Sequence, residues 1–126
     1  MKMKLYARLA SLIESAARCD ETGNDEWATK HRHTIRDLVK EHLPSGCGFD
    51  AGTTLDEGAS TPDKLVFETY FHHMDEHGGY DGWTEHKVIV TPSLAHGYDL
   101  RVTGRDRNDI KSYIGETFAH ALDTEV

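Results

Sequence analysis

The spacing of apolar residues changes its period twice along this chain of 126 residues. Over residues 3–20 and 25–43, apolar side chains recur every three or four positions, which is the period of a helix with one buried face. From residue 64 to residue 103 the period is two, as in strands with one apolar face. Over residues 106–122 the helical period returns. The order α-α-β-β-β-α predicts a two-layer α+β fold: an N-terminal helical hairpin and a C-terminal helix on a three- to four-stranded antiparallel sheet.

Short polar residues and proline mark the ends of the predicted helices. Gly23 favours a left-handed C-terminal position, and Asn24 is a good N-cap for the second helix, which Pro44 ends. Asp106 is the expected N-cap of the last helix. The buried face predicted for the second helix comprises Trp27, Thr34, Ile35, Leu38, Val39 and His42. The buried face predicted for the last helix comprises Ile110, Tyr113, Ile114, Thr117, Ala121 and Leu122.

Residues 44–62 are the least regular part of the chain, with four glycines and two prolines. A structureless segment of this length is unusual inside a compact domain, so the run GTTLD at residues 52–56 is expected to form a short edge strand. If it does not, the segment is a mobile loop and a candidate for function. We expect one domain over residues 1–126: the helical hairpin at 3–43, this Gly-rich loop, and the sheet with its helix at 63–126.

Composition limits the partners that the chain can have. The formal charge is −8 and the isoelectric point is near 5.5, which argues against general affinity for nucleic acid or anionic membranes. The same charge suits a protein partner with a basic surface. No apolar run approaches the roughly 18 residues of a membrane span, so a cytoplasmic location is expected. Cys19 and Cys47 are expected to be free thiols, and no cofactor is predicted.

The stretch FHHMDEHGGYDGWTEH at residues 71–86 holds four of the nine histidines and four carboxylates. Its glycines predict the tip of a β-hairpin. Because His72 and His73 are adjacent, a strand would direct them to opposite faces. The alternative is a metal-dependent hydrolase or nuclease, with a site formed by His72, His86 and either Asp75 or Glu85, although no established metal-binding motif is present.

Two further groups of residues are candidates for binding. Tyr80 and Trp83 form an aromatic pair beside Asp81 and Glu76, and exposed aromatic residues are frequent hot spots of protein interfaces. The pair could equally cover the end of the sheet. The second group is a set of cations at the start of the last helix, where a helix N-terminus and arginines favour an anion or nucleotide. Its members are Arg101, Arg105, Arg107 and Lys111.

Several short runs carry a resemblance to known sequences: GFD near residue 49, FHHM at 71–74, WTEH at 83–86 and RNDIK at 107–111. Over its C-terminal two-thirds the chain resembles a family of small hypothetical proteins encoded by bacteriophages and prophages. The resemblance implies an accessory role inside a bacterial host cell. It suggests non-enzymatic binding of a host protein, as by an anti-CRISPR or other anti-defence inhibitor, and it implies no catalytic residue.

Overall fold

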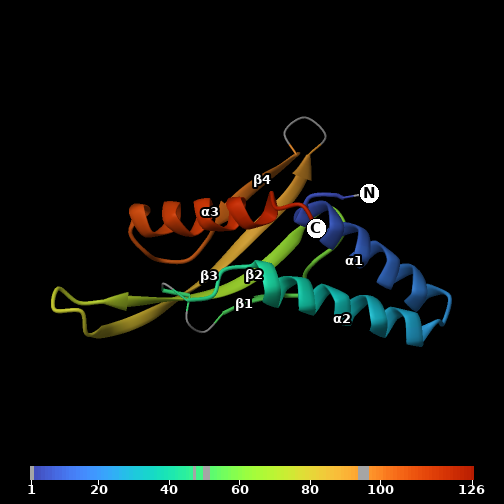
Figure 1. The fold of residues 1–126 in the computed structure, drawn as a ribbon, viewed down its shortest axis with the longest axis horizontal. Helices are drawn as coiled ribbons and strands as arrows, with labels where there is room; N and C mark the ends of the chain where they lie inside the picture. The colour runs from blue at the N-terminus through green and yellow to red at the C-terminus, as the bar shows by residue number, and fades with distance from the viewer. Residues whose placement is uncertain (1, 47, 50–51, 94–96) are drawn as a thin grey trace.

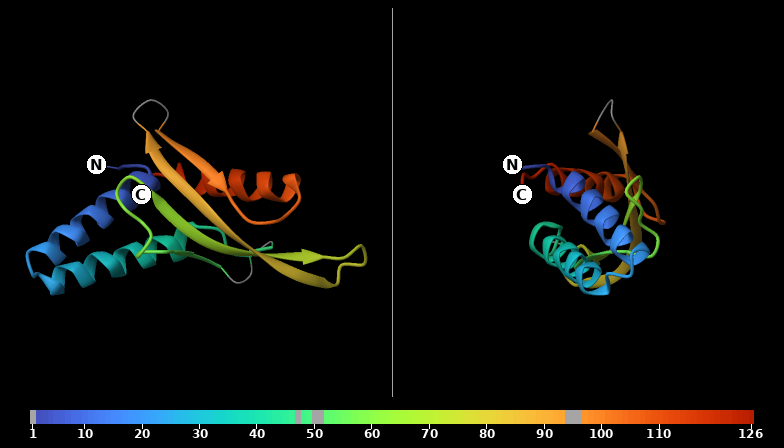
Figure 2. Two further views of the ribbon diagram at one scale, coloured as in Figure 1. Left: turned by 180° about the vertical axis from the view of Figure 1, so that it is seen from behind. Right: turned by 90° about the vertical axis from the view of Figure 1, so that its right-hand side faces the viewer.

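The structure is a computed structural model that describes residues 2–46, 48–49, 52–93 and 97–126. Three helices and a four-stranded antiparallel sheet form two layers, which confirms the predicted α+β fold, and all three helices lie on one face of the sheet (Figures 1 and 2). Among the described residues, no helix is both long and apolar enough to cross a bilayer. The elements are α1 (Leu5–Glu21), α2 (Asp25–His42), β1 (Thr53–Leu55), β2 (Leu65–Met74), β3 (Tyr80–Ser93), β4 (Gly97–Val102) and α3 (Asn108–Leu122).

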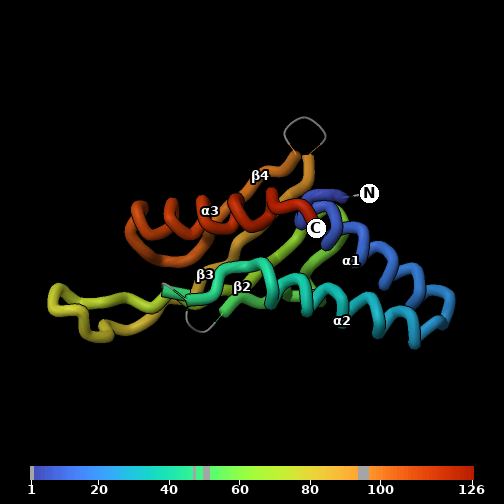
Figure 3. The backbone as a smooth tube through the Cα atoms, in the orientation of Figure 1, coloured from blue at the N-terminus to red at the C-terminus, as the bar shows by residue number. Residues whose placement is uncertain are grey.

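Helices α1 and α2 form the predicted hairpin. Asn24 caps α2, because its side-chain oxygen accepts a hydrogen bond from the Trp27 backbone N–H at 3.4 Å, and Gly23 takes a φ of 75° before it. The prediction that Trp27 is buried was wrong, since 51% of it is exposed. It lies in the first turn of α2, at the end of the helical hairpin that extends away from the sheet (Figure 3), where the sheet cannot cover it. The buried residues of α2 are Ala28, Ile35 and Val39.

The sheet has the order β1-β2-β3-β4, and each strand is antiparallel to its neighbour. The register pairs Phe67 with Val88 and Leu65 with Val90, and these buried side chains face the helices. They form one apolar core with residues of the three helices, among them Leu9, Ile35 and Phe118. The alternation predicted for residues 64–103 therefore describes a sheet with one buried face.

The irregular segment at 44–62 contributes both to the sheet and to the core. Strand β1 lies within it, as the run GTTLD predicted. Phe49 is only 1% exposed, and its ring packs against Phe71 and Phe118, with centroids 5.3 and 6.4 Å apart. The close approach requires glycine at position 48: φ is +101° there, and a Cβ would lie 2.6 Å from the Phe71 ring. Cys19 is a free thiol, and Cys47 lies outside the described residues.

Candidate functional site

The β2–β3 hairpin projects beyond the helices, at the end of the molecule opposite the α1–α2 connection (Figures 1 and 2). We call residues 70–85 the hairpin arm. Its turn is the one that the glycines predicted, because the Asp75 carboxylate accepts hydrogen bonds from the backbone N–H groups of His77 (2.9 Å) and Gly79 (2.8 Å). The arm is thus an ordered two-stranded element with a defined tip.

Four rings on the arm form an aromatic patch, which we define as Tyr70, His72, Tyr80 and Trp83. Tyr70 packs edge-to-face on Trp83 with ring centroids 5.3 Å apart, and His72 packs in the same way on Tyr80 at 5.6 Å. These contacts leave Tyr80 63% exposed and Trp83 55% exposed. The two residues predicted as an exposed aromatic pair therefore do not cover the end of the sheet; they are packed from the side and open to solvent.

The arm is strongly acidic. Residues 65–86 contain no lysine or arginine and five carboxylates, of which the four in the arm are all exposed: Asp75, Glu76, Asp81 and Glu85. With neutral histidines this stretch carries more than half of the net charge of the chain. Exposed aromatic rings among carboxylates form a surface that complements a basic one.

At the base of the arm lies a buried polar cluster of His73, Thr84, His86 and Asp106, here called the His–Asp cluster. One oxygen of Asp106, Oδ2, is its shared acceptor: Nε2 of His73 lies 3.0 Å away, Nε2 of His86 lies 3.1 Å away, and the Thr84 hydroxyl donates to it at 2.8 Å. The side chain of His86 is fully buried, and those of Asp106 and His73 are 6% and 21% exposed. Buried polar groups cost free energy unless they are paired, and these are paired with one another.

Proton positions follow from the partners of His86. Its Nδ1 lies 2.8 Å from the Thr103 carbonyl oxygen, which can only accept, so Nδ1 carries a proton. Its Nε2 faces Asp106 Oδ2 and the Thr84 oxygen, whose proton is donated to Asp106.

The Asp106 carboxyl responds to opposing influences. Burial, the largest of them, acts to raise its pKa. Hydrogen bonds from Thr84 and from the Arg107 backbone N–H, together with the two imidazoles, act to lower the pKa and outweigh burial. The pKa of Asp106 is therefore below its ordinary value, which is the behaviour of a carboxylate that the fold stabilises in its charged form.

Asp106 is not the N-cap of α3, as the sequence had predicted. The N-cap is Arg107, without a side-chain capping bond, and the helix begins at Asn108. Asp106 does not cap the helix because its Oδ2 contacts the imidazoles of His73 and His86. The preceding loop crosses closely over β3: at Gly104, with a φ of +106°, a Cβ would lie 2.6 Å from the Glu85 carbonyl oxygen and 2.8 Å from His86 Nδ1. The His–Asp cluster thus fastens the arm to the loop between β4 and α3.

The predicted metal set does not converge. His72 pairs with Trp83 on the face that carries the aromatic patch, whereas His86 is buried on the face that packs on the helices. Asp75 is engaged in the turn, and Glu85 pairs with Tyr70 on the same face as the patch. Across the described residues, no group of three or more His, Cys, Asp or Glu side chains is arranged to hold a metal ion.

The expectation that His72 and His73 point to opposite faces was correct, but it did not foresee that His73 meets His86 at Asp106. Both histidines lie on the same face of the hairpin as Phe71 and Val88, because His73 is two residues after Phe71, His86 is two residues before Val88, and the register pairs the two sets across the strands. Alternation within each strand could have revealed that shared face. The participation of Asp106, twenty residues after His86, had no local signal.

The residues of the predicted anion site lie on β4, in the loop that follows it and in the first turn of α3. Arg101 is exposed on β4, and Arg105 and Arg107 are exposed in the loop before α3, where Arg107 pairs with Asp109 at 3.3 Å. Lys111 lies half-buried in the first turn of α3. The Arg107 N–H at this helix start already binds the Asp106 carboxylate at 2.8 Å. An internal anion thus occupies part of the position that an external one would need.

Comparisons with protein-family models, with curated proteins and with solved structures each found no match to this chain.

Proposed function

We propose that the protein acts without catalysis, by binding another protein through the hairpin arm, and that the partner presents a basic surface. One observation carries the proposal: the arm projects from the body and exposes Tyr80 and Trp83 amid carboxylates, with no lysine or arginine in the same stretch. Isolated apolar side chains on a surface are ordinary, but a cluster of exposed rings on a projecting element is typical of an interaction site.

The aromatic rings would supply most of the affinity. Burying the exposed half of a tyrosine or tryptophan removes about 100 Å² of surface from water, worth about 2–3 kcal/mol each. Such a contribution is in the range of interface hot spots. The edge-to-face packing of Trp83 on Tyr70 holds the ring in one orientation before binding, which reduces the entropy lost on association.

The carboxylates of the arm would act mainly on the rate of encounter. Exposed charges steer a partner of opposite charge, and salt screens this attraction over about 10 Å at 0.1 M. The His–Asp cluster has a supporting role in the proposal. It ties both strands of the hairpin to the loop before α3, so the arm is presented as a rigid extension of the sheet.

The resemblance to phage-encoded proteins extends the proposal to the kind of partner. In a bacterial host cell, effectors that cut or bind nucleic acid have positively charged channels, and an acidic arm complements such a channel. We propose a host effector of this type, such as a CRISPR nuclease, as the partner class.

The test is affinity capture from a bacterial lysate, followed by a measured dissociation constant for the purified pair. We expect Tyr80→Ala and Trp83→Ala each to weaken binding about 30-fold or more, and added salt to slow association. The matched control is Trp27→Ala, because Trp27 is 51% exposed but lies at the opposite end of the molecule. Equal affinity of wild type and Trp83→Ala, or an equal loss in Trp27→Ala, would refute the role of the arm.

A further inference from the structure

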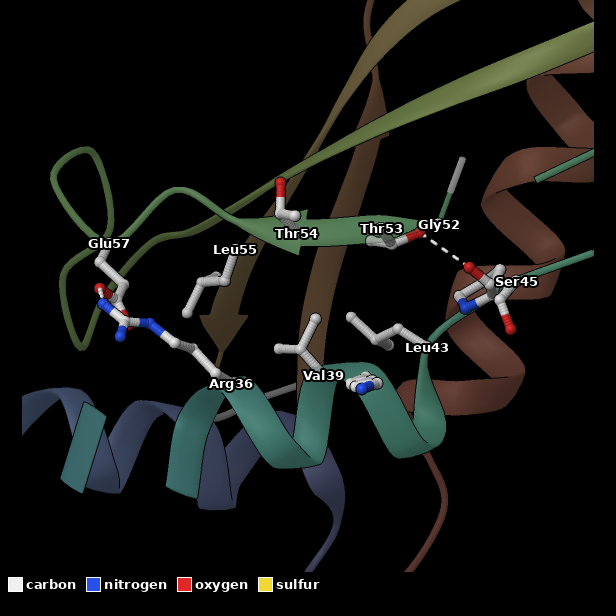
Figure 4. A pocket seen from close by; sticks show the side chains of 11 residues that line it. Arg36, Val39, Leu43, Ser45, Gly52, Thr53, Thr54, Leu55 and Glu57 are labelled. Carbon is white, nitrogen blue, oxygen red and sulfur yellow. Dashed lines mark hydrogen bonds and ion pairs between the residues drawn. The ribbon is translucent and has the colours of Figure 1, made fainter. Parts of the chain in front are cut away.

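A groove of about 560 Å³ lies between helix α2 and the edge strand β1 (Figure 4). Val39 on α2 and Leu43, directly after the helix, extend toward β1, and together with Leu55 they make the apolar lining of the groove. Arg36, Lys40 and Glu57 add charged groups to the same groove. The volume is in the range of pockets that hold drug-sized ligands or short peptide segments.

The backbone of β1 has hydrogen-bonding groups that face this groove. The Asp56 N–H donates to the Val66 carbonyl oxygen at 2.8 Å, so residues 56 and 66 are a hydrogen-bonded pair. In an antiparallel ladder such pairs alternate, and Thr54 therefore faces Glu68 of β2 in the same way. The N–H and C=O groups of Thr53 and Leu55 then point to the other side of β1. In the described part of the chain, no strand pairs with that edge.

Among the described residues that line the groove, one oxygen of Glu57 and the Lys40 ammonium have no partner. Arg36 donates to Glu57 Oε2 at 3.0 Å, but the other oxygen, Oε1, is buried with no hydrogen-bond donor among the described residues. A buried acceptor in this state costs about 1–3 kcal/mol until a donor reaches it. Lys40 is exposed at the groove, and within the described ranges it has no ion pair. The groove therefore offers an available cation.

We propose that this groove binds an extended peptide segment of a partner protein, which adds to β1 as a fifth strand of the sheet. The main chain of the peptide pairs with Thr53 and Leu55, which is the mode of β-strand addition. One apolar side chain enters between Val39 and Leu43, and an acidic side chain two positions along, on the same face, contacts Lys40.

A peptide accounts for more of these features than a small apolar molecule does. An apolar ligand would fill the lining but leave the edge backbone groups and the Lys40 ammonium without partners. The site is separate from the hairpin arm, at the opposite edge of β2 from β3, and it does not depend on the function proposed for the arm.

The experiment is a selection from a library of biotinylated nine-residue peptides, degenerate at every position except for the absence of cysteine. Wild-type protein should enrich peptides with an apolar residue and an Asp or Glu two positions away. Lys40→Glu should lose the acidic preference and bind the selected peptide about three- to tenfold more weakly at low salt. The control is Lys30→Glu, also on α2 but away from the groove, which should bind as wild type does.

Two measurements on the selected peptide locate its contact. Backbone amide resonances of Thr53 and Leu55 should shift on titration. Leu55→Ala and Leu55→Pro both remove the leucine side chain, but only proline also removes the backbone N–H. Thermal melting checks that both variants are folded. Weaker binding by Leu55→Pro than by Leu55→Ala then supports strand addition. An absence of enrichment, equal enrichment by Lys40→Glu, or shifts confined to residues 70–85 would overturn the proposal.

Discussion

Replacing Asp106 by alanine tests the account of the His–Asp cluster. The substitution removes the acceptor shared by Nε2 of His73, Nε2 of His86 and the hydroxyl of Thr84. Each donor left without a partner in a buried position costs about 1–3 kcal/mol, and three donors lose their shared acceptor here. Because the donors can partly relax toward solvent through the 21% exposed His73, we expect about 3–5 kcal/mol of lost stability. For a chain of this length the melting temperature should fall by about 10–20 °C.

The assay is urea unfolding followed by circular dichroism, with Asp109→Ala as the matched control. Asp109 lies three residues further on, is 70% exposed and pairs with the exposed Arg107, so its removal should cost less than about 1 kcal/mol. If the free energies of unfolding of Asp106→Ala and Asp109→Ala lie within about 1 kcal/mol of each other, the cluster does not stabilise the fold.

The same variant has an expected pH dependence. The fold lowers the pKa of Asp106, so the ionised carboxylate stabilises the native state fully above the unfolded pKa of about 3.9. This contribution is lost as the pH falls through the lower, folded pKa. The difference in unfolding free energy between wild type and Asp106→Ala should therefore be largest above about pH 4 and shrink below it. A difference that grows on acidification would contradict the lowered pKa.

Three further substitutions test other parts of the structure by urea unfolding. Phe49→Ala should lower the free energy of unfolding by about 3–5 kcal/mol, because it leaves a cavity among the core rings. A decrease below about 1 kcal/mol would mean that Phe49 is not buried. Gly104→Ala should cost about 1–3 kcal/mol or more, since φ is +106° and the Cβ would press on the Glu85 carbonyl. Asn24→Ala should cost about 0.5–1 kcal/mol through the lost cap of α2, and Asn24→Gly should recover most of it.

The fold was predictable because its signals are local. The change of apolar period located both layers, and the run GTTLD was sufficient to place β1 at a sheet edge. The exposure of Trp27 was not predictable in the same way. Its position matches the helical period, but whether a helix position is covered depends on how far the sheet extends beneath it.

The candidate site was predictable only in part. Exposed aromatic residues beside a glycine turn are a local pattern, and Tyr80 and Trp83 follow it. The His–Asp cluster brings together residues from β2, β3 and the loop before α3, so it depends on strand register and on the path of that loop. Asp106 was misassigned because an aspartate before an apolar helix has the local signature of an N-cap, whichever group it finally binds.

Strand β3 runs unbroken from the arm into the core, and this continuity has a consequence for amide exchange. Val88 and Val90 are paired on both sides, with β2 and β4, and are fully buried, whereas Tyr80 and Trp83 are paired with β2 alone. Protection of the backbone amides against deuterium exchange should therefore rise steeply along β3. At the tip, exchange needs only local opening, whereas in the core it needs a free energy close to that of global unfolding. A protein docked on the arm would slow deuterium uptake at the tip and leave the core amides unchanged, and that footprint would be visible before the partner's structure is known.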